Sequence, residues 1–154
     1  MIICWIDVGA KWALVIKGAT CNYNSYRFSF NQWMQEAYKF LTEKIQKYEP
    51  LVIVIGEAMW AKATVKQHSK YYWIIELIAE QNKIQVIYCN DLQARKSVLQ
   101  WSHYHSLTEK TKAWTFKVLT WKEAKQWVMN HFKEADSDIA DAKLFCEWYI
   151  NNIK

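Results

Sequence analysis

Two short apolar runs, each leading into a carboxylate, constrain the fold of this chain more than any other feature. Residues 2–6 are followed directly by Asp7, and residues 51–55 are followed by Gly56 and Glu57. An unbroken run of leucine and β-branched residues is typical of a strand that is covered on both faces. Because a strand alternates its side chains between two faces, neighbouring strands can direct their carboxylates at one point. The sequence therefore predicts a covered sheet that brings two distant acids together.

The rest of the sequence alternates between strand-like and helix-like patterns. We expect strands over residues 2–7, 12–17, 21–30, 51–55 and 84–88, and helices over residues 31–48, 63–82, 91–100, 121–132 and 137–151. The first three strands would be antiparallel, with a hairpin turn at residues 17–20, and residues 101–120 would form an insertion. The strand–helix–strand order between residues 51 and 88 implies a right-handed parallel crossover. These elements predict an α/β fold with a mixed sheet.

The composition fits a single globular domain over residues 1–154. Three glycines and one proline leave no room for a linker. The N-terminus lacks the basic head of a secretory signal, and no apolar run approaches the length of roughly 20 residues that spans a bilayer. The four cysteines are far apart and form no C-x-x-C pair, so reduced thiols are expected. We therefore expect a cytoplasmic protein that is neither secreted nor embedded in a membrane.

A further pair of carboxylates, Asp138 and Asp141, lies at the start of the last expected helix. Three residues place them about 60° apart around a helix, so both project from one face. Clustered carboxylates attract hard divalent cations, and two such ions can drive in-line displacement at a phosphodiester. Simpler explanations exist, because Asp7 suits a turn beside Gly9. Ser137 or Asp138 also suits a helix cap. A metal-dependent nuclease is the interpretation that uses all four acids.

Basic residues gather between residues 90 and 125, while the whole chain carries a net charge of +5. Seven lysines and arginines stand there against three acids, interleaved with tryptophan, tyrosine and phenylalanine. A surface of this composition tracks phosphates and stacks on bases. The alternative is a solvated loop with a small aromatic cluster.

The ordered set of acids resembles the ribonuclease H-like nuclease superfamily, and within it the RuvC-type Holliday junction resolvases. The segments that carry the resemblance are Ile6-Asp7-Val8-Gly9, Ile55-Gly56-Glu57-Ala58 and Asp138-Ile139-Ala140-Asp141-Ala142, and their spacing is similar. Lys122 resembles the lysine that opens the helix before the last one in that family. The match covers nearly the whole chain. It implies a ribonuclease H-like mixed five-stranded sheet, three antiparallel strands plus two parallel, flanked by helices.

The resemblance implies a site in which Asp7 bridges two Mg²⁺ ions, with Glu57 on one side and Asp138 and Asp141 on the other. Mn²⁺ would substitute for Mg²⁺. Lys122 would offset the charge of the scissile phosphate, and hydrolysis would leave a 5′-phosphate and a 3′-hydroxyl. Which of Asp138 and Asp141 dominates stays open.

The resemblance also implies a homodimer that cuts four-way DNA junctions by paired symmetric nicks. Such an enzyme would act in DNA recombination and repair. It would be located in the cytoplasm or wherever the replicating DNA is. The helix over residues 63–82 is apolar nearly all round and is the expected dimer contact, the alternative being a helix buried in its own core. Contacts with DNA are expected from Trp60, Lys62, Lys66, Arg95, Lys96, Lys110, Lys112, Lys117 and Lys125.

The chain departs from that family at two places. Residues 119–121 are Leu-Thr-Trp where small residues are common, and residues 71–73 are Tyr-Tyr-Trp where glycines are common. These departures bear on junction binding and dimer packing more than on metal chemistry. Two other functions fit the same residues: a ribonuclease H that cuts RNA–DNA hybrids, and a non-catalytic nucleic-acid-binding module whose acids cap helices and form turns.

Overall fold

The computed structural model describes residues 2–7, 12–18, 22–29, 34–56, 62–98 and 121–152, apart from the side chains of Asp7, residues 62–68, Leu92, Lys96 and Trp121. The strands are β1 (Ile3–Asp7), β2 (Trp12–Lys17), β3 (Tyr23–Phe28), β4 (Val52–Gly56) and β5 (Gln85–Cys89). The helices are α1 (Met34–Tyr48), α2 (Lys62–Gln81), α3 (Asp91–Val98), α4 (Trp121–Phe132) and α5 (Ser137–Asn152). Each predicted strand and helix is confirmed, with ends that differ by a few residues. The expected turn at residues 17–20 falls partly outside the described residues, and the 101–120 stretch falls wholly outside them.

The strands form one mixed sheet in the order β3-β2-β1-β4-β5. β1 pairs antiparallel with β2, and β2 pairs antiparallel with β3. β4 is parallel to β1, and β5 is parallel to β4. The predicted sheet of three antiparallel and two parallel strands is therefore confirmed. Because β1, β4 and β5 run in the same direction, their carboxyl ends meet at one end of the sheet.

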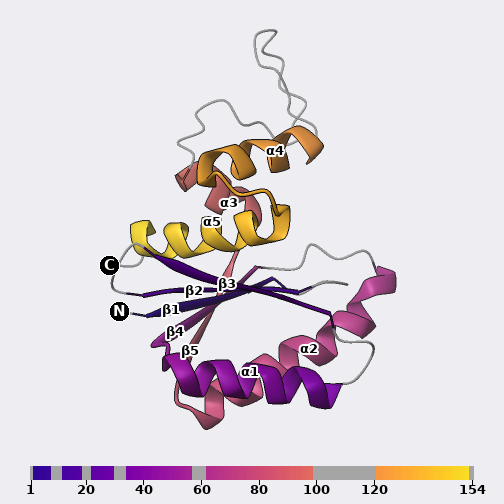
Figure 1. The fold of residues 1–154 in the computed structure, drawn as a ribbon. Coiled ribbons are helices and arrows are strands. Elements are labelled where there is room, and N and C mark those ends of the chain that lie inside the picture. Colours follow the sequence, from indigo (N-terminus) through magenta and orange to yellow (C-terminus); the bar gives the residue numbers. More distant parts are fainter. Residues whose placement is uncertain are drawn as a thin grey trace, which may run out of the picture.

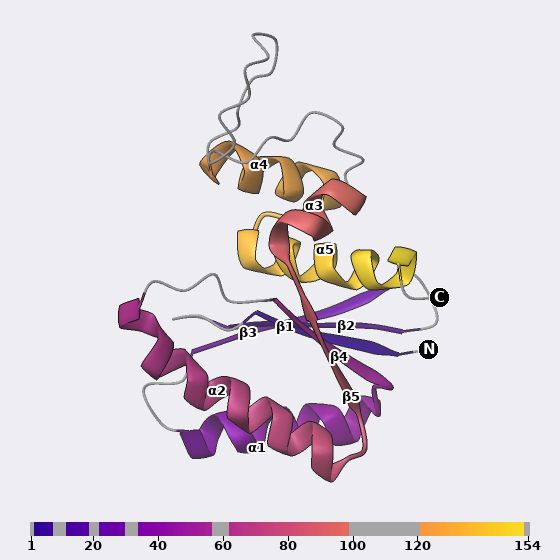
Figure 2. The same ribbon diagram turned by 180° about the vertical axis from the view of Figure 1, so that it is seen from behind.

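Helices cover both faces of this sheet, as Figures 1 and 2 show. α1 and α2 lie side by side on one face and pack against each other. α5 lies across the other face and contacts β1, β2, β3 and β4. α3 and α4 both pack on α5, so the molecule has a further layer on that side (Figure 1).

The face under α1 and α2 is closed by aliphatic and aromatic side chains. Leu14 and Ile55 of the sheet meet Leu41 of α1 and Ile75 of α2, and all four are buried. Cys4 is buried in the same core. Alternate residues of each strand supply this core, and the residues between them supply the core of the opposite face. This division explains why residues 3–6 of β1 and 52–55 of β4 are apolar without interruption.

The opposite face is anchored by aromatic packing between β1 and α5. The rings of Trp5 and Phe145 are stacked, with centroids 4.7 Å apart and planes 9° from parallel. The Phe145 ring also lies over Gly56, 3.5 Å from where a Cβ on that residue would stand. Cys146 is buried in this second core. α5 therefore packs closely against the middle of β1 and the end of β4.

Three of the helices end in a left-handed residue that is not glycine. Glu49 after α1, Lys83 after α2 and Lys133 after α4 have φ values of 47°, 58° and 51°. After α2, the turn is closed by a backbone hydrogen bond of 2.8 Å from Ile84 N to Ala79 O. A residue with a Cβ is disfavoured in this conformation by about 1–2 kcal/mol. Each of these helix ends therefore carries local strain.

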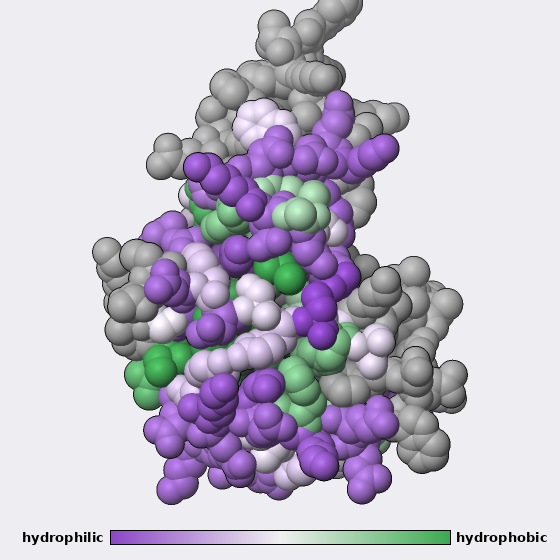
Figure 3. Space-filling model, in the orientation of Figure 1, coloured by the Kyte–Doolittle hydropathy of each residue, from purple (hydrophilic) through white to green (hydrophobic). Residues whose placement is uncertain are grey.

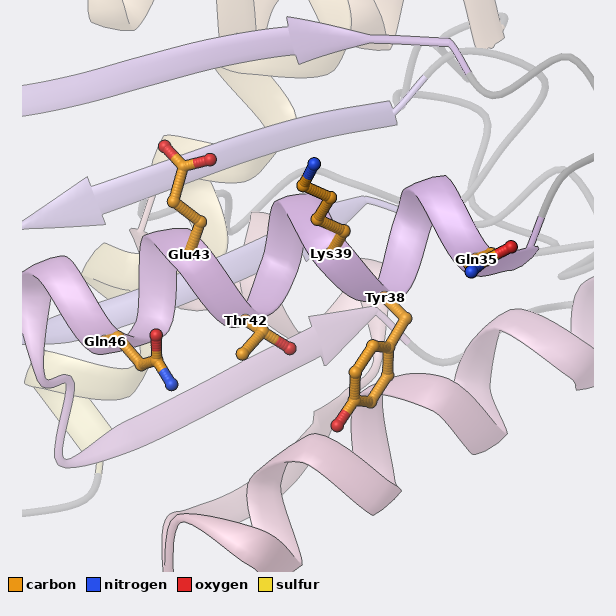
Figure 4. A pocket seen from close by; sticks show the side chains of 6 residues that line it. All are labelled: Gln35, Tyr38, Lys39, Thr42, Glu43 and Gln46. Carbon is orange, nitrogen blue, oxygen red and sulfur yellow. The ribbon is translucent and has the colours of Figure 1, made fainter.

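The outward surfaces of α1 and α4 are mostly hydrophilic (Figure 3). A hollow of about 440 Å³ opens on the outside of α1 (Figure 4), lined by Gln35, Tyr38, Lys39, Thr42, Glu43 and Gln46. It is on the opposite side of the sheet from α5, and none of its lining residues belongs to the predicted site. None of the described helices combines the length and the hydropathy that a bilayer-spanning segment needs.

Candidate metal and nucleic-acid site

Two of the predicted metal ligands are placed where parallel strands end. Asp7 is the last residue of β1, and Glu57 directly follows Gly56, the last residue of β4. Ile6 pairs with Ile55, so residues 7 and 56 are neighbours at the carboxyl end of this strand pair. The side chain of Asp7 and the whole of Glu57 lie outside the described part of the chain, so the direction of these carboxylates stays a prediction.

Asp138 and Asp141 lie on one face at the beginning of α5. The helix begins here because Asp136 caps it: its Oδ1 accepts hydrogen bonds from the backbone N–H groups of Asp138, at 2.9 Å, and Ile139, at 3.1 Å. Asp is among the preferred capping residues. The capping role that we considered for Ser137 or Asp138 therefore belongs to Asp136.

Arg27 of β3 links the beginning of α5 to the sheet. Its Nη1 is 2.5 Å from Asp138 Oδ2, and its Nε is 2.9 Å from Asp136 Oδ2. Arg27 pairs across the ladder with Ala13, which in turn pairs with Asp7. One row of the sheet therefore runs from Asp7 to Arg27, and the guanidinium joins that row to Asp138. The first turn of α5 thus lies at the end of the sheet where β1 and β4 terminate.

Two further cations contact the pair. Lys125 Nζ of α4 is 3.4 Å from Asp138 Oδ1 and 3.8 Å from Asp141 Oδ2, so one ammonium lies between the two carboxylates. Arg95 of α3 is buried, and its Nη2 is 3.3 Å from Asp141 Oδ1. Together with Arg27, three different elements each direct a cation at these acids. The carboxylates at the beginning of α5 are therefore all paired with cations in this structure.

The two acids differ in their ionisation. Burial favours the neutral form of Asp138, but Arg27 and Lys125 outweigh this effect and hold the pKa of its carboxyl below the ordinary value. Burial raises the pKa of Asp141 to about 6, in spite of Arg95 and Lys125. Asp138 is therefore the more exposed and more readily ionised member of the pair, and Asp141 is the buried member.

Arg95 is not placed as predicted, whereas the role of Lys122 stays a prediction. Arg95, expected to contact DNA, has no exposed side-chain surface, so that prediction was wrong: the guanidinium is taken up by carboxylates inside the protein. Lys122, expected beside the scissile phosphate, is exposed on α4, whereas Lys125 is the lysine that contacts the acids. The structure describes only the backbone of three other predicted residues, Lys62 and Lys66 in α2 and Lys96 in α3. The remaining predicted contacts lie outside the described residues: Trp60, Lys110, Lys112 and Lys117.

Sequence reasoning missed the contact made by Arg27 and the capping role of Asp136. Asp136 carried a usable signal, because an acid directly before an expected helix is a good candidate for its cap. Arg27 carried none, because its partner Asp138 is 111 residues away along the chain. Only the strand register reveals that contact.

The donor chemistry fits a hard divalent cation. Carboxylate oxygens are the ligands that Mg²⁺ and Mn²⁺ prefer, and the Lys125 ammonium already lies between two of them. Among the described side chains, no group of three or more His, Cys, Asp or Glu residues comes together to hold a metal. Two of the four predicted ligands, Asp7 and Glu57, are not among those side chains.

Neither the protein-family models nor the curated proteins contain a match to this sequence. Among solved structures, RuvC from Thermus thermophilus in complex with Holliday junction substrate has a TM-score of 0.67 and 11% sequence identity, over 97% of this chain and 95% of that chain. A second Thermus thermophilus RuvC structure gives a TM-score of 0.66 at 9% identity, with the same coverage. Fowlpox virus resolvase in complex with Holliday junction DNA gives 0.57 at 16% identity, over 100% of both chains.

These similarities establish the fold. The chain has the mixed five-stranded sheet flanked by helices that the resemblance predicted, and it shares this fold with the RuvC structures. At 9 to 16% identity they show the architecture alone. The chemistry has to be argued from the residues of this chain.

Proposed function

We propose that this chain is a divalent-metal-dependent endonuclease that resolves four-way DNA junctions, in recombination or repair of DNA. One observation carries the proposal: the acids at the beginning of α5 lie at the end of the sheet where β1 finishes with Asp7 and β4 leads into Glu57. The fold supports it, because the two resolvases compared above were solved with Holliday junction DNA.

In this proposal, Asp7, Glu57, Asp138 and Asp141 would hold two Mg²⁺ ions, or Mn²⁺ in their place. When bound, such ions supply an activated water and stabilise the leaving oxygen of a phosphodiester, so that cleavage leaves a 5′-phosphate and a 3′-hydroxyl. The four carboxylates would orient the ions, and α5 holds two of these carboxylates, Asp138 and Asp141, on one face.

The lysine that offsets charge on the scissile phosphate is, in our proposal, Lys125. Its ammonium lies within 4 Å of both Asp138 and Asp141, whereas Lys122 is exposed on the same helix. A cation next to the metal-binding acids is placed to stabilise negative charge that develops during phosphodiester cleavage.

A homodimer would suit a four-way junction, because both have two-fold symmetry. α2 buries Ile74, Ile75 and Ile78 in its own core, yet Trp73 on its outer side is 65% exposed. Tyr88 of the edge strand β5 is 41% exposed, stacks on Tyr72 of α2 and donates a hydrogen bond to Glu76. We propose this surface of α2 and β5 as the contact with a second copy, which would place two sites for paired symmetric nicks.

Cleavage of a labelled synthetic four-way junction in Mg²⁺ tests the proposal, beside linear duplex and RNA–DNA hybrid. Asp7→Asn and Asp138→Asn should abolish paired nicks. Glu43→Gln, a matched loss of one acid on the far face of α1, should leave them intact. Cleavage of the hybrid alone would make the protein a ribonuclease H, and junction binding with no cleavage by the unaltered protein would leave only a binding module.

A further inference from the structure

Arg95 is an unusual residue for the position it occupies. Among the described residues, Arg95 and Asp141 are the two charged side chains buried in the protein, and they are partners: Arg95 Nη2 is 3.3 Å from Asp141 Oδ1. The same guanidinium contacts Asp91, one turn earlier in α3, with its Nε 3.1 Å from Asp91 Oδ1. One buried cation thus joins a carboxylate of its own helix to a carboxylate of α5.

Stability alone does not require this arrangement. The cost of removing an ion pair from water is about as large as the attraction that the pair gains, so apolar side chains often serve a buried site equally well. The packing of α3 on α5 has other contacts as well, because Ala94 is buried there and Asn152 Nδ2 donates a hydrogen bond of 2.8 Å to Ser97 Oγ. Arg95 has one effect that apolar packing could not reproduce. It fixes the position of the Asp141 carboxylate.

The geometry divides the two oxygens of that carboxylate between two sides. Oδ1 is directed at Arg95, inside the α3–α5 contact. Oδ2 lies 3.8 Å from Lys125 Nζ, which is also 3.4 Å from Asp138 Oδ1. One oxygen of Asp141 is therefore committed to the protein interior, and the other is turned toward Asp138.

We propose that Arg95 is a positioning residue that sets the affinity of the site for divalent cations by fixing the orientation of Asp141. This inference rests on the proposed function. Groups that hydrogen-bond a metal-ligating side chain fix its direction, and their loss typically costs 10–100-fold in metal affinity or activity. Arg95 also connects the site to the parallel strands, because α3 begins at the end of β5, where Asn90 Oδ1 accepts a hydrogen bond of 3.3 Å from Gln93 N.

The test is a titration of the purified protein with Mg²⁺, and in parallel with Mn²⁺, following the melting temperature as the readout. Arg95→Gln should raise the metal concentration at the midpoint of this stabilisation by about 10–100-fold. Arg95→Lys keeps the charge but lacks the planar fork, so it should give a smaller shift in the same direction. Asp91→Asn is the matched control, because it removes the charge of the other carboxylate that the same guanidinium contacts and leaves the Asp141 contact in place. Its midpoint should equal that of the unaltered protein.

Three outcomes would overturn the inference. Arg95→Gln and Arg95→Lys could lower only the metal-free melting temperature, which would make Arg95 a structural residue. The midpoint could fall in Arg95→Gln, which would show that removing the positive charge matters more than orientation. Asp91→Asn could shift the midpoint as far as Arg95→Gln. If Arg95→Gln does not fold, Arg95→Lys against Asp91→Asn decides. Failure of the proposed function is separate, because it would appear as absent junction cleavage in the unaltered protein.

Discussion

The two faces of the sheet are built from different side chains. Under α1 and α2, the buried residues are aliphatic or aromatic apart from Cys4, and the paired hydroxyls of Tyr26 and Tyr48 are only partly buried. Under α5, a similar apolar core is bordered by Arg95 and Asp141, both buried, with Arg27 and Lys125 beside them. Both faces belong to the same five strands. The difference shows that the two faces have separate roles. The face under α1 and α2 stabilises the fold by apolar packing, whereas the face under α5 also holds charged groups that apolar packing does not need.

The largest expected effect is a loss of stability that leaves the site unaffected. Ile75→Ala, on α2, should lower the free energy of unfolding by about 2–5 kcal/mol, because it leaves a cavity in a closed apolar core. The Mg²⁺ concentration at half-maximal junction cleavage should not change. Urea unfolding and cleavage assays well below the melting temperature measure the two quantities.

Leu144→Ala is the counterpart on α5, three residues after Asp141, and Leu144 is as deeply buried as Ile75. It should cost similar stability and should also shift the Mg²⁺ dependence, because the cavity lies under the helix that carries the acids. Equal Mg²⁺ dependence in both variants would contradict the division of roles between the faces.

The next largest effect separates the two lysines of α4. Lys125→Met should reduce the rate of junction cleavage by about 100-fold, because it removes the cation beside Asp138 and Asp141. Lys122→Met removes the same charge from an exposed position on the same helix and should have little effect. Single-turnover cleavage at saturating Mg²⁺ measures both. A larger loss in Lys122→Met would return the catalytic role to the lysine that the sequence suggested.

The dependence of stability on pH should also distinguish the faces. Three carboxyls with lowered pKa values lie on the α5 side. The hydrogen bond from Lys143 lowers the pKa of Glu134; burial raises that of Glu147, but Lys17 and Tyr23 bring it below its ordinary value. Asp138 is the third. A group whose pKa is lowered by folding contributes stability above its ordinary pKa. This contribution is lost as the pH falls from the ordinary pKa through the lowered pKa of the folded state.

Asp141 acts in the opposite direction. Its pKa of about 6 in the folded protein exceeds the ordinary 3.8, so the folded state takes up the proton first and gains stability as the pH falls from 6 toward 4. Below the ordinary value of 4.5 for glutamate, the other carboxyls reverse this gain. The metal-free protein should therefore gain stability as the pH falls from about 6 and be most stable near pH 4.5. Melting temperatures across pH 3–8 measure this, and a steady fall from pH 7 downward would show that Asp141 is not buried as described.

The smallest effect concerns helix ends and should be equal on both sides of the sheet. Lys83→Gly after α2 and Lys133→Gly after α4 each relieve a left-handed residue and should raise stability by about 1 kcal/mol. In a chain of this size, that corresponds to roughly 2–4 °C in melting temperature. Lys47→Gly, inside the last turn of α1, is the control and should lower stability by about the same amount. A loss of stability in Lys83→Gly would mean that the lysine makes contacts that outweigh the strain.

Most of the fold could be predicted from the sequence because its signals are local. The composition of residues 51–55 predicts a buried strand, and the spacing of Asp138 and Asp141 predicts that they lie on one face of a helix. The ion pairs that join the beginning of α5 to β3 and α3 are not local, and here prediction failed. An arginine in a basic stretch reads as a surface residue, yet Arg95 is buried because α3 packs on α5, which brings it to Asp141, 46 residues away. Arg27 likewise meets Asp138 only because β3 is in register with β2 and β1.

The position of two cysteines allows each face to be followed by chemical labelling. Cys4 is buried in the core under α1 and α2, and Cys146 is buried in the core under α5. Burial raises the pKa of both thiols above the ordinary value, so the reactive thiolate is scarce in the folded protein. Alkylation at either site therefore reports the detachment of the helices that cover it. Comparing the two rates by peptide mass spectrometry would show which layer leaves the sheet first.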